Sequence, residues 1–502
     1  MAMINKTNIE NLNITNKSSF ISLKDKHLNM DTLEKQLEMS FQSINKFYNK
    51  IDEIPIRPNV KPGFIYEKYI DDFPENPVEF KHVLNDFEND VFPNLCLWQH
   101  PSFFAYYQAP TSHHAITLEM IGTAMHTPNF NWNVSPAAHE LEWVVMEWIV
   151  KMLGIGKKFS FENGGCGGCV TSTTEGIFLS VNQAKFKKIR ELQLDPMDPR
   201  RLKFAAYYPF TNKDWAEKAL EIKDIHFKRC LNVYRNEETG NFNIDPNELR
   251  EKIKADIEEG LIPFWYGAQI GSTACGASDQ LEIIGPILKE YDIYLNVDGA
   301  HAGFFSILPE YRIKGIEFVN NICINMVKSG MAVNQACLMF NDDKNTLVLS
   351  TGAIDGEIYK TNEEGIKINY KDFSIGFGRR MAGIKLYGML KTIGKTGYQK
   401  YLRTIIERGN YFLNKIKTNP RFELFVKPSF GLICFRIKPL NGDSLEEYNE
   451  ENIQFQEKMN TKTEDGFISS SSVNGIKFIR FVSANVNTEE KHIDKLIEKI
   501  QK

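Results

Sequence analysis

An aspartate and a lysine each follow closely on an apolar run of the chain. Asp298 ends the run IYLNVD, and Lys328 comes shortly after a second run at 322–325. In an open α/β sheet both side chains would lie beyond the carboxyl ends of neighbouring strands, where such sheets bind ligands. A lysine amine there can form a Schiff base with an aldehyde, while a carboxylate can hold a pyridine nitrogen protonated. The pair therefore indicates pyridoxal phosphate, although strand-end aspartates and solvated lysines are also common without a cofactor.

A segment rich in glycine and hydroxyl groups, GGCVTSTTEG, comes earlier in the chain. It carries Ser172, Thr173 and Thr174 directly before an apolar helical pattern at 177–187. Backbone amides at the start of a helix attract anions. We therefore expect this segment to hold the cofactor phosphate. Turns of this composition are common, so the prediction gains its weight from Asp298 and Lys328 in the same domain.

The positions of these residues depend on an alternation of strands and helices that begins near Cys166. Strand patterns occur at 203–208, 226–234, 262–270 and 293–297, and helix patterns lie between them. Among the helices, we expect Thr211 to cap one with Asp214 at the box position, Asp245-Pro246 to open one that Gly260 closes, and 281–290 to form another. Such alternation predicts an α/β fold with a mainly parallel central sheet and helices on both faces.

Four regions are expected along the chain. Residues 1–28 are polar and predicted to be disordered, and 29–100 form a helical arm with helices near 31–51 and 76–91. Residues 101–400 form the large cofactor-binding domain, and 401–502 form a small C-terminal α+β domain. The arm has apolar faces without an evident core, which suggests that it packs on a partner subunit.

Within the large domain, Ser135-Pro136 should start a helix that Gly154 ends. The segment 341–370 has no strong period and is predicted to be a long mobile loop. Two helices are expected after it, at 381–393 and 397–418, and three strands in the C-terminal region.

Composition excludes several classes of protein. Of 502 residues, 42% are hydrophobic and 25% are charged, and the net charge is −4, so nothing points to nucleic acid. The first twenty residues lack the apolar core of a signal peptide, and no apolar run reaches the length of a membrane span. Eight cysteines without a scaffold pattern suggest reduced thiols in a cytoplasmic protein. Cys166 and Cys169 match Cys-x-x-Cys, but a glycine-rich loop is favoured over a redox or metal site.

Several segments in order resemble one family. They are HPSFFAYY, NWNVSPAAHELEWVVMEWIVKML, TSTTEG, IPFWYGAQIGSTACGASDQL, IYLNVDGAHAGF, NYKDFSIGFGRR and FIRFVSANVNTEE. From about residue 31 to its end, the chain resembles the group II pyridoxal-phosphate decarboxylases, and among them the aromatic-L-amino-acid decarboxylases. The resemblance implies fold type I, pyridoxal 5'-phosphate as cofactor, a homodimer, and active sites at the subunit interface.

The resemblance also implies roles for individual residues. The cofactor would be held by Lys328 as a Schiff base, Asp298 at the pyridine nitrogen, Ala300 against the ring, Thr273 close to both, and Ser172 and Thr173 at the phosphate. Tyr106 and Tyr107 would line the substrate pocket. Tyr359 falls where the family keeps a catalytic tyrosine that returns a proton to carbon.

Two departures from the family pattern bear on the outcome of the reaction. The family usually has histidine directly before the lysine, where this chain has Val327. It also stacks a histidine on the cofactor ring, where this chain has Lys213. Trp215, two residues further on, offers another stacking face.

The expected function is decarboxylation of an L-amino acid, with an aromatic side chain favoured, to its amine. One alternative is an aldehyde synthase on the same scaffold, which the change at Lys213 favours and the retained Tyr359 disfavours. Another is a non-catalytic member of the family, which the loss of both histidines would fit. A nicotinamide-binding protein is disfavoured, because no Gly-x-Gly-x-x-Gly follows a first strand.

Overall fold

The computed structural model describes residues 30–352, 364–438, 444–461 and 466–501, and the chain divides into two compact units between Cys96 and Leu97. The first unit is helical and contains α1 (Met30–Asn49), α2 (Tyr66–Tyr69) and α3 (Phe80–Asp86). Glu88 joins its helices by accepting hydrogen bonds from Ser43 at 2.8 Å and Lys46 at 2.5 Å. The helix expected near 31–51 is confirmed. The second helix is shorter than expected and continues as a π-helical turn at Phe87–Val91.

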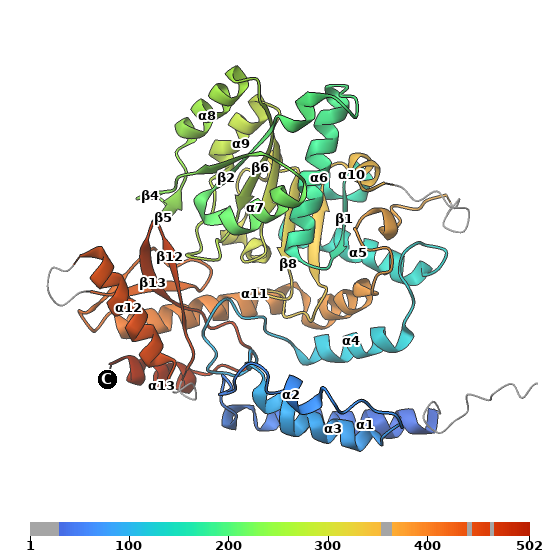
Figure 1. Ribbon diagram of the computed structural model, residues 1–502, viewed down its shortest axis with the longest axis vertical. Helices are drawn as coiled ribbons and strands as arrows, with labels where there is room; N and C mark the ends of the chain where they lie inside the picture. Colours follow the sequence, from blue (N-terminus) through green and yellow to red (C-terminus); the bar gives the residue numbers. More distant parts are fainter. Residues whose placement is uncertain (1–29, 353–363, 439–443, 462–465, 502) are drawn as a thin grey trace, which may run out of the picture. The chain divides into compact units, whose positions relative to one another are not determined.

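A seven-stranded sheet forms the centre of the second unit (Figure 1). Its order is β1-β9-β8-β7-β6-β2-β3. The strands are β1 (Cys166–Val170), β2 (Phe204–Pro209), β3 (Phe227–Leu231), β6 (Ile262–Gln269), β7 (Tyr294–Asp298), β8 (Asn321–Asn325) and β9 (Cys337–Asn341). Strands β8, β7, β6, β2 and β3 run parallel, and β9 is antiparallel to both of its neighbours. The expected α/β fold with a mainly parallel sheet is confirmed.

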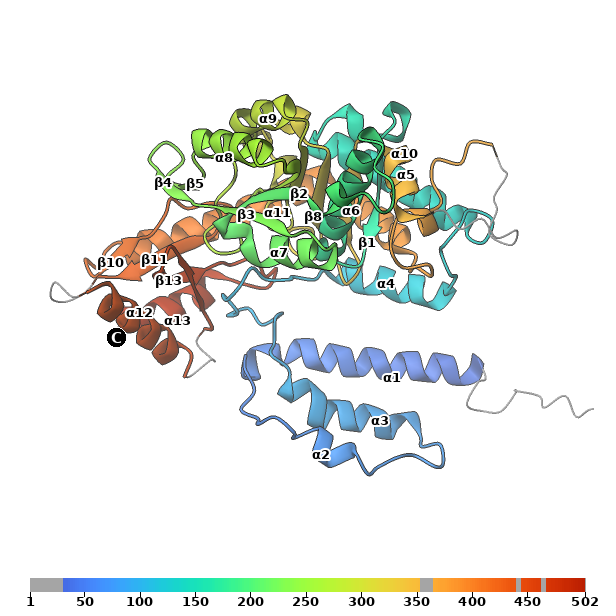
Figure 2. The same cartoon turned by 45° about the horizontal axis from the view of Figure 1, so that its top comes forward.

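Helices cover both faces of this sheet (Figure 2). On one face α6 (Thr173–Glu191) and α7 (Lys213–Ile222) pack with β2 and β6 around the buried indole of Trp265. On the other face α8 (Pro246–Glu258) and α9 (Leu281–Glu290) bury their apolar side chains in the main core. Both faces of the sheet are thus covered by helices, so polar side chains can contact a ligand at the carboxyl ends of the strands.

Two further helices support the large core. The helix α5 (Pro136–Leu153) begins after Ser135 and ends at Gly154, whose φ of 61° suits a residue without a Cβ. Both predicted ends of this helix are confirmed. The helix α4 (His113–Met125) was not predicted, and it packs on α11 (Ala382–Ile416).

The C-terminal residues build a smaller antiparallel sheet of order β10-β11-β13-β12. Its elements are β10 (Phe422–Leu424), β11 (Ile433–Ile437), α12 (Leu445–Met459), β12 (Ser469–Val473), β13 (Ile476–Phe481) and α13 (Glu490–Gln501). The rings of Phe412 and Phe481 stack 3.8 Å apart in its core. The three expected strands are present, whereas β12 and α12 were not predicted. The strands β4 (Tyr234–Asn236) and β5 (Asn241–Asn243) form a separate antiparallel hairpin.

Three local predictions are wrong. Cys166 to Cys169 lies in β1 and not in a loop, because its glycines let the strand pack closely: a Cβ on Gly167 would lie 2.7 Å from the Phe340 ring. Thr211 does not cap α7, since Asn212 occupies the cap position and the Thr211 hydroxyl instead accepts a 2.6 Å hydrogen bond from Gln269.

The third wrong prediction concerns 341–370, which is not one aperiodic loop. It contains α10 (Lys344–Thr351), capped by the carboxylate of Asp343 at 3.0 Å from the Thr346 amide. Tyr359 lies outside the described residues. By contrast, the two helices expected at 381–393 and 397–418 are both present within α11, which is interrupted at Gly394, where φ is 67°.

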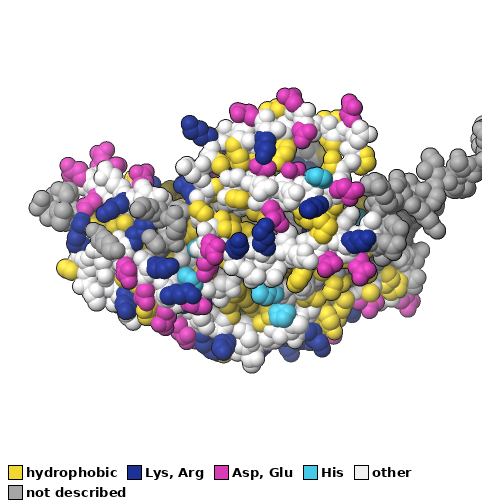
Figure 3. All heavy atoms as spheres, turned by 90° about the horizontal axis from the view of Figure 1, so that it is seen from below, with side chains coloured by type: hydrophobic (Ala, Val, Ile, Leu, Met, Phe, Trp, Pro, Cys, Tyr) yellow, Lys and Arg dark blue, Asp and Glu magenta, His cyan; other side chains and the backbone are white. Residues whose placement is uncertain are grey.

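The surface carries mixed charge. Basic and acidic side chains are interspersed with apolar ones over the face in Figure 3. Within the described ranges, no helix has the length and apolar character needed to cross a bilayer.

Candidate cofactor and active site

Asp298 and Lys328 come together at the carboxyl edge of the parallel strands. Asp298 is the last residue of β7 and pairs in register with Cys323 of β8, and Lys328 follows the end of β8 by three positions. The backbone fixes the aspartate: its carboxylate accepts the Ala300 amide at 2.8 Å, and its peptide oxygen accepts the Ile270 amide at 2.9 Å. The juxtaposition predicted from the sequence is therefore present.

The environment of the pair is apolar. Burial raises the pKa of Asp298 above its usual range, while the Ala300 amide and Lys328 oppose that rise. Burial likewise lowers the pKa of Lys328 below its usual 10.5, against the attraction of Asp298. Among the described residues no ion pair within 4.0 Å involves either of them. The lowered pKa favours the neutral, nucleophilic form of the amine more than water would, and the two side chains lie too far apart for an ion pair.

The predicted phosphate segment forms the start of α6. Ser172 is the N-cap residue, and its hydroxyl accepts the Glu175 amide at 3.2 Å. The hydroxyl of Thr173 lies 3.2 Å from the thiol of Cys337, at the beginning of β9. The Glu175 carboxylate turns back to the Thr171 amide at 2.7 Å and reaches the Ile375 amide at 3.1 Å. The first turn of α6 is therefore held rigidly, with amides and hydroxyls that suit a phosphate.

The residues expected near the cofactor ring lie on different segments. Ala300 is buried two positions after Asp298, as a residue packing on the ring would be. Trp215 is half-buried on α7, and its indole edge lies 3.2 Å from where a Cβ on Gly267 of β6 would be. Lys213 is exposed at the start of α7, and Thr273 is exposed in the turn after β6.

The two tyrosines expected at the substrate pocket point to different surroundings. Tyr106 has a φ of 56°, is half-exposed, and stacks on Trp98 with ring centroids 5.3 Å apart. Tyr107 is buried, and its ring centroid lies 4.2 Å from that of His301. The structure therefore brings Tyr107 to the interior beside His301, three positions after Asp298, and leaves Tyr106 half-exposed.

Two buried residues near the pair were missed from the sequence. His301 follows Asp298 by three positions, and Arg480 comes from β13. Arg480 donates to the Ala274 oxygen at 2.9 Å and to the Ser469 hydroxyl at 3.2 Å, while its Nη2 has no partner in the described part of the chain. Burial lowers the pKa of both His301 and Lys328, and the charge of Arg480 adds to this effect at each of them. The sequence held one signal for His301, which is its position as a polar residue shortly after the aspartate at the strand end. It held no signal for Arg480.

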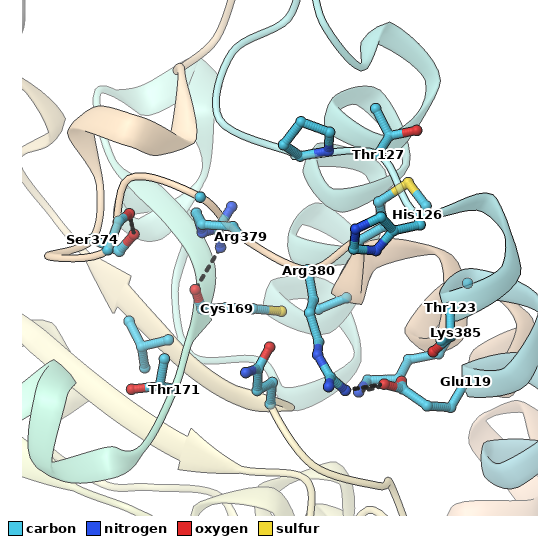
Figure 4. A pocket seen from close by; sticks show the side chains of 18 of the residues that line it. Glu119, Thr123, His126, Thr127, Cys169, Thr171, Ser374, Arg379, Arg380 and Lys385 are labelled. Carbon is cyan, nitrogen blue, oxygen red and sulfur yellow. Dashed lines mark hydrogen bonds and ion pairs between the residues drawn. The ribbon is translucent and has the colours of Figure 1, made fainter. Parts of the chain in front are cut away.

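A cavity of about 540 Å³ lies beside the phosphate segment (Figure 4). Glu119 of α4 meets Lys385 and Arg380 there at 2.7 and 2.8 Å, and Arg379 donates to the Cys169 oxygen at 2.5 Å. None of the site residues predicted from the sequence lines it. The cavity is thus separate from the Asp298–Lys328 pair, although Thr171 and Glu175 both line the cavity and lie at or next to the start of α6.

The residues present fit pyridoxal phosphate. A buried carboxylate, a buried amine with a lowered pKa, and a helix start rich in hydroxyls supply the three groups that this cofactor requires. Lys328 would hold its aldehyde carbon, Asp298 its ring nitrogen, and the start of α6 its phosphate.

Comparisons with known proteins support pyridoxal phosphate as the cofactor. The pyridoxal-dependent decarboxylase conserved domain matches residues 62–438. Tyrosine decarboxylase of Papaver somniferum is 30% identical over 496 residues, which cover 95% of this chain and 96% of that one. 4-Hydroxyphenylacetaldehyde synthase of Rhodiola rosea is 29% identical over 480 residues, which cover 94% and 95%.

A solved structure shows the same agreement in three dimensions. Oryza sativa TDC with PLP and tryptamine superposes with a TM-score of 0.90 at 27% identity, covering 94% of this chain and 98% of that one. The family, the fold and the cofactor expected from the sequence are thereby confirmed. The chain belongs to the pyridoxal-dependent decarboxylase family.

Proposed function

We propose that the protein converts an aromatic L-amino acid to its amine and carbon dioxide, with pyridoxal phosphate attached to Lys328. The observation that carries the proposal is the buried pair of Asp298 and Lys328 at adjoining strand ends. The bound cofactor supplies an electron sink for the bond that breaks. The chain supplies the charge and the shape that make this sink effective.

The role of Asp298 follows from its burial. A carboxylate in an apolar environment strongly favours a positive partner, so it would keep the ring nitrogen protonated. Ala300, Thr273 and Trp215 would pack around the ring, and Ser172 and Thr173 would bind the phosphate. The hydrogen bonds that fix the backbone of Asp298 keep its carboxylate from moving when a ligand enters.

An amino-acid substrate also fits the charge of the site. Arg480 is a buried cation without a carboxylate partner among the described residues, and burial lowers its pKa. An unpaired buried cation is costly, and a carboxylate is the anion that the planar guanidinium binds best. Arg480 would therefore bind the substrate carboxylate. Tyr107 would contact the aromatic side chain, with Tyr106 at the entrance.

Relatives with both outcomes of the reaction resemble this chain. They include a tyrosine decarboxylase and a tryptophan decarboxylase, but also a 4-hydroxyphenylacetaldehyde synthase. We favour the amine, because Tyr359 is the tyrosine expected to return a proton to carbon. The aldehyde remains the second candidate, since Lys213 stands where the family stacks a histidine.

We also propose a homodimer. The apolar residues Leu33, Leu37, Phe41 and Ile44 form one stripe of α1, and each is at least 43% exposed. In the second unit, α4 exposes Met120, Ile121 and Met125 to between 50 and 61%. Apolar faces of this kind are normally covered by another chain, and a second copy would cover both. A cytoplasmic location is proposed with it, because the eight cysteines form no disulfide within the described residues.

One experiment tests the proposed function. Purified protein with pyridoxal phosphate is incubated with each of the twenty amino acids and with dihydroxyphenylalanine, and carbon dioxide, amine, aldehyde and peroxide are measured. Amine with equimolar carbon dioxide from an aromatic amino acid supports the proposal. Aldehyde with peroxide supports the second candidate, and bound cofactor without any product supports a non-catalytic protein.

A further inference from the structure

His301 is a buried histidine that connects the lysine segment to its surroundings. It is 3% exposed, and its ring packs between Tyr107 and Phe430, with centroids 4.2 and 6.1 Å away. Its backbone oxygen accepts the hydroxyl of Ser329 at 3.0 Å, and Ser329 directly follows Lys328. This hydrogen bond links the backbone of His301 to the segment that carries Lys328.

The contacts of the ring determine its tautomer. Nδ1 lies 3.1 Å from the Gly271 oxygen and 3.3 Å from the Ser272 oxygen. Both oxygens can only accept, so Nδ1 must carry the hydrogen. Burial, with Lys328 and Arg480 nearby, lowers the pKa of His301 to about 3, so the ring is neutral. Nε2 is consequently a hydrogen-bond acceptor.

This acceptor has no partner among the described residues. Nε2 is fully buried and receives no hydrogen bond. Most buried acceptors in native proteins are paired, and an exception calls for an explanation, of which a catalytic role is one. His139 and His301 both have a shifted pKa, and of these two shifts Lys328 contributes only to that of His301. The positions at which the family pattern has histidine hold Lys213 and Val327, so His301 is the imidazole available to this site.

The group that arrives can be identified from the exchange at the cofactor. When a substrate amine takes the place of Lys328, its bond to the cofactor carbon forms as the lysine bond breaks, and the two amine hydrogens end on the lysine nitrogen. Resting on the proposed function, we propose that Nε2 of His301 accepts a hydrogen bond from the released amine of Lys328. Asp298 would not be available as an acceptor then, because it would hold the ring nitrogen. His301 is thus a positioning residue for the lysine.

Two substitutions separate this role from a structural one. In His301→Asn the amide nitrogen lies where Nδ1 was, so the bond to the Gly271 and Ser272 oxygens is kept and the Nε2 acceptor is lost. In His301→Gln the side-chain oxygen reaches the Nε2 position, so the acceptor is kept. Each protein is loaded with pyridoxal phosphate and mixed with methylamine in a stopped-flow spectrophotometer. The change in the cofactor absorbance reports release of Lys328 without any decarboxylation.

The proposal expects His301→Asn to slow this exchange by roughly tenfold or more, the rate equivalent of one hydrogen bond to an amine, and His301→Gln to stay near the parent rate. If instead His301→Gln exchanges slowly and His301→Asn exchanges at the parent rate, the exchange depends on the Nδ1 hydrogen bond and the proposal is wrong. Equal exchange rates in all three proteins also overturn it. If the Asn variant does not fold, His301→Phe, which keeps the ring packing, replaces it with the same expected slow exchange. If the parent binds no cofactor at Lys328, the proposed function fails, and the proposal fails with it.

Discussion

Arg480 offers a prediction whose size follows from its contacts. Replacing it with methionine removes hydrogen bonds to the Ala274 oxygen and the Ser469 hydroxyl, at 2.9 and 3.2 Å. Each is worth about 1.5–3 kcal/mol, since the donor is charged. The same change also removes a buried cation without a carboxylate partner, whose desolvation costs several kcal/mol. The two effects oppose each other, so the free energy of unfolding of the cofactor-free protein should change by no more than about 2 kcal/mol.

Substrate binding should respond much more strongly. Removing one partner of a buried charge pair costs about 2–5 kcal/mol, which is roughly 30-fold to several-thousand-fold in the dissociation constant. Arg480→Met should therefore weaken binding of an aromatic L-amino acid by at least 30-fold. It should leave binding of the corresponding amine nearly unchanged, because the amine has no carboxylate. Arg480→Lys keeps the charge and should lie between the parent and Arg480→Met.

The assay is a titration of each cofactor-loaded protein with amino acid and with amine, followed through the cofactor absorbance. Thermal unfolding of the same proteins without cofactor supplies the stability comparison. Equal weakening of amino acid and amine would mean that Arg480 only supports the fold. Unchanged amino-acid binding would mean that the carboxylate is bound elsewhere.

Three other predictions follow from the same structure. Burial raises the pKa of Asp279 to about 7, above 3.8 in the unfolded chain, so its protonated form stabilises the fold at low pH and that stability is lost as pH rises through about 7. Asp279→Asn should therefore raise Tm relative to the parent more at pH 8 than at pH 5, and a difference independent of pH would contradict this. Ile121→Asp should convert a dimer to monomers in sedimentation experiments, whereas Ile283→Asp, an exposed isoleucine on α9, should not; a parent that sediments as an active monomer would refute the dimer. Tyr359→Phe should slow amine formation by about 10²–10⁴-fold and increase the share of aldehyde, and amine formation at the parent rate would remove Tyr359 from the mechanism.

Local patterns in the sequence predicted that Asp298 and Lys328 lie near each other in the sheet. The alternation of strands and helices placed Asp298 and Lys328 at adjoining strand ends, because parallel strands present their carboxyl ends on one edge. The ends of α5 were equally predictable, since Ser135, Pro136 and Gly154 act through their own backbone geometry. In both cases the decisive interactions lie close together in the sequence.

The rest depended on contacts between distant segments. The antiparallel placement of β9 is set by its pairing with β1 and β8, which no local pattern encodes. Thr211 had the composition of a cap, but Gln269, far along the chain, uses its hydroxyl. Arg480 belongs to a strand of the small sheet and reaches the site only through the packing of that sheet on the loop of Ala274. A side chain such as Arg480 can be recognised as part of the site only once its burial and its unpaired polar atoms are known.

We infer that Lys328 carries the cofactor, and chemical reduction of the loaded protein identifies the lysine that does. Protein loaded with pyridoxal phosphate is reduced with borohydride and digested, and the peptide that carries the cofactor is identified by mass spectrometry. We expect a single modified peptide with the cofactor on Lys328, and none in Lys328→Ala. Cofactor attached to another lysine, or retained by Lys328→Ala at the parent level, would contradict it.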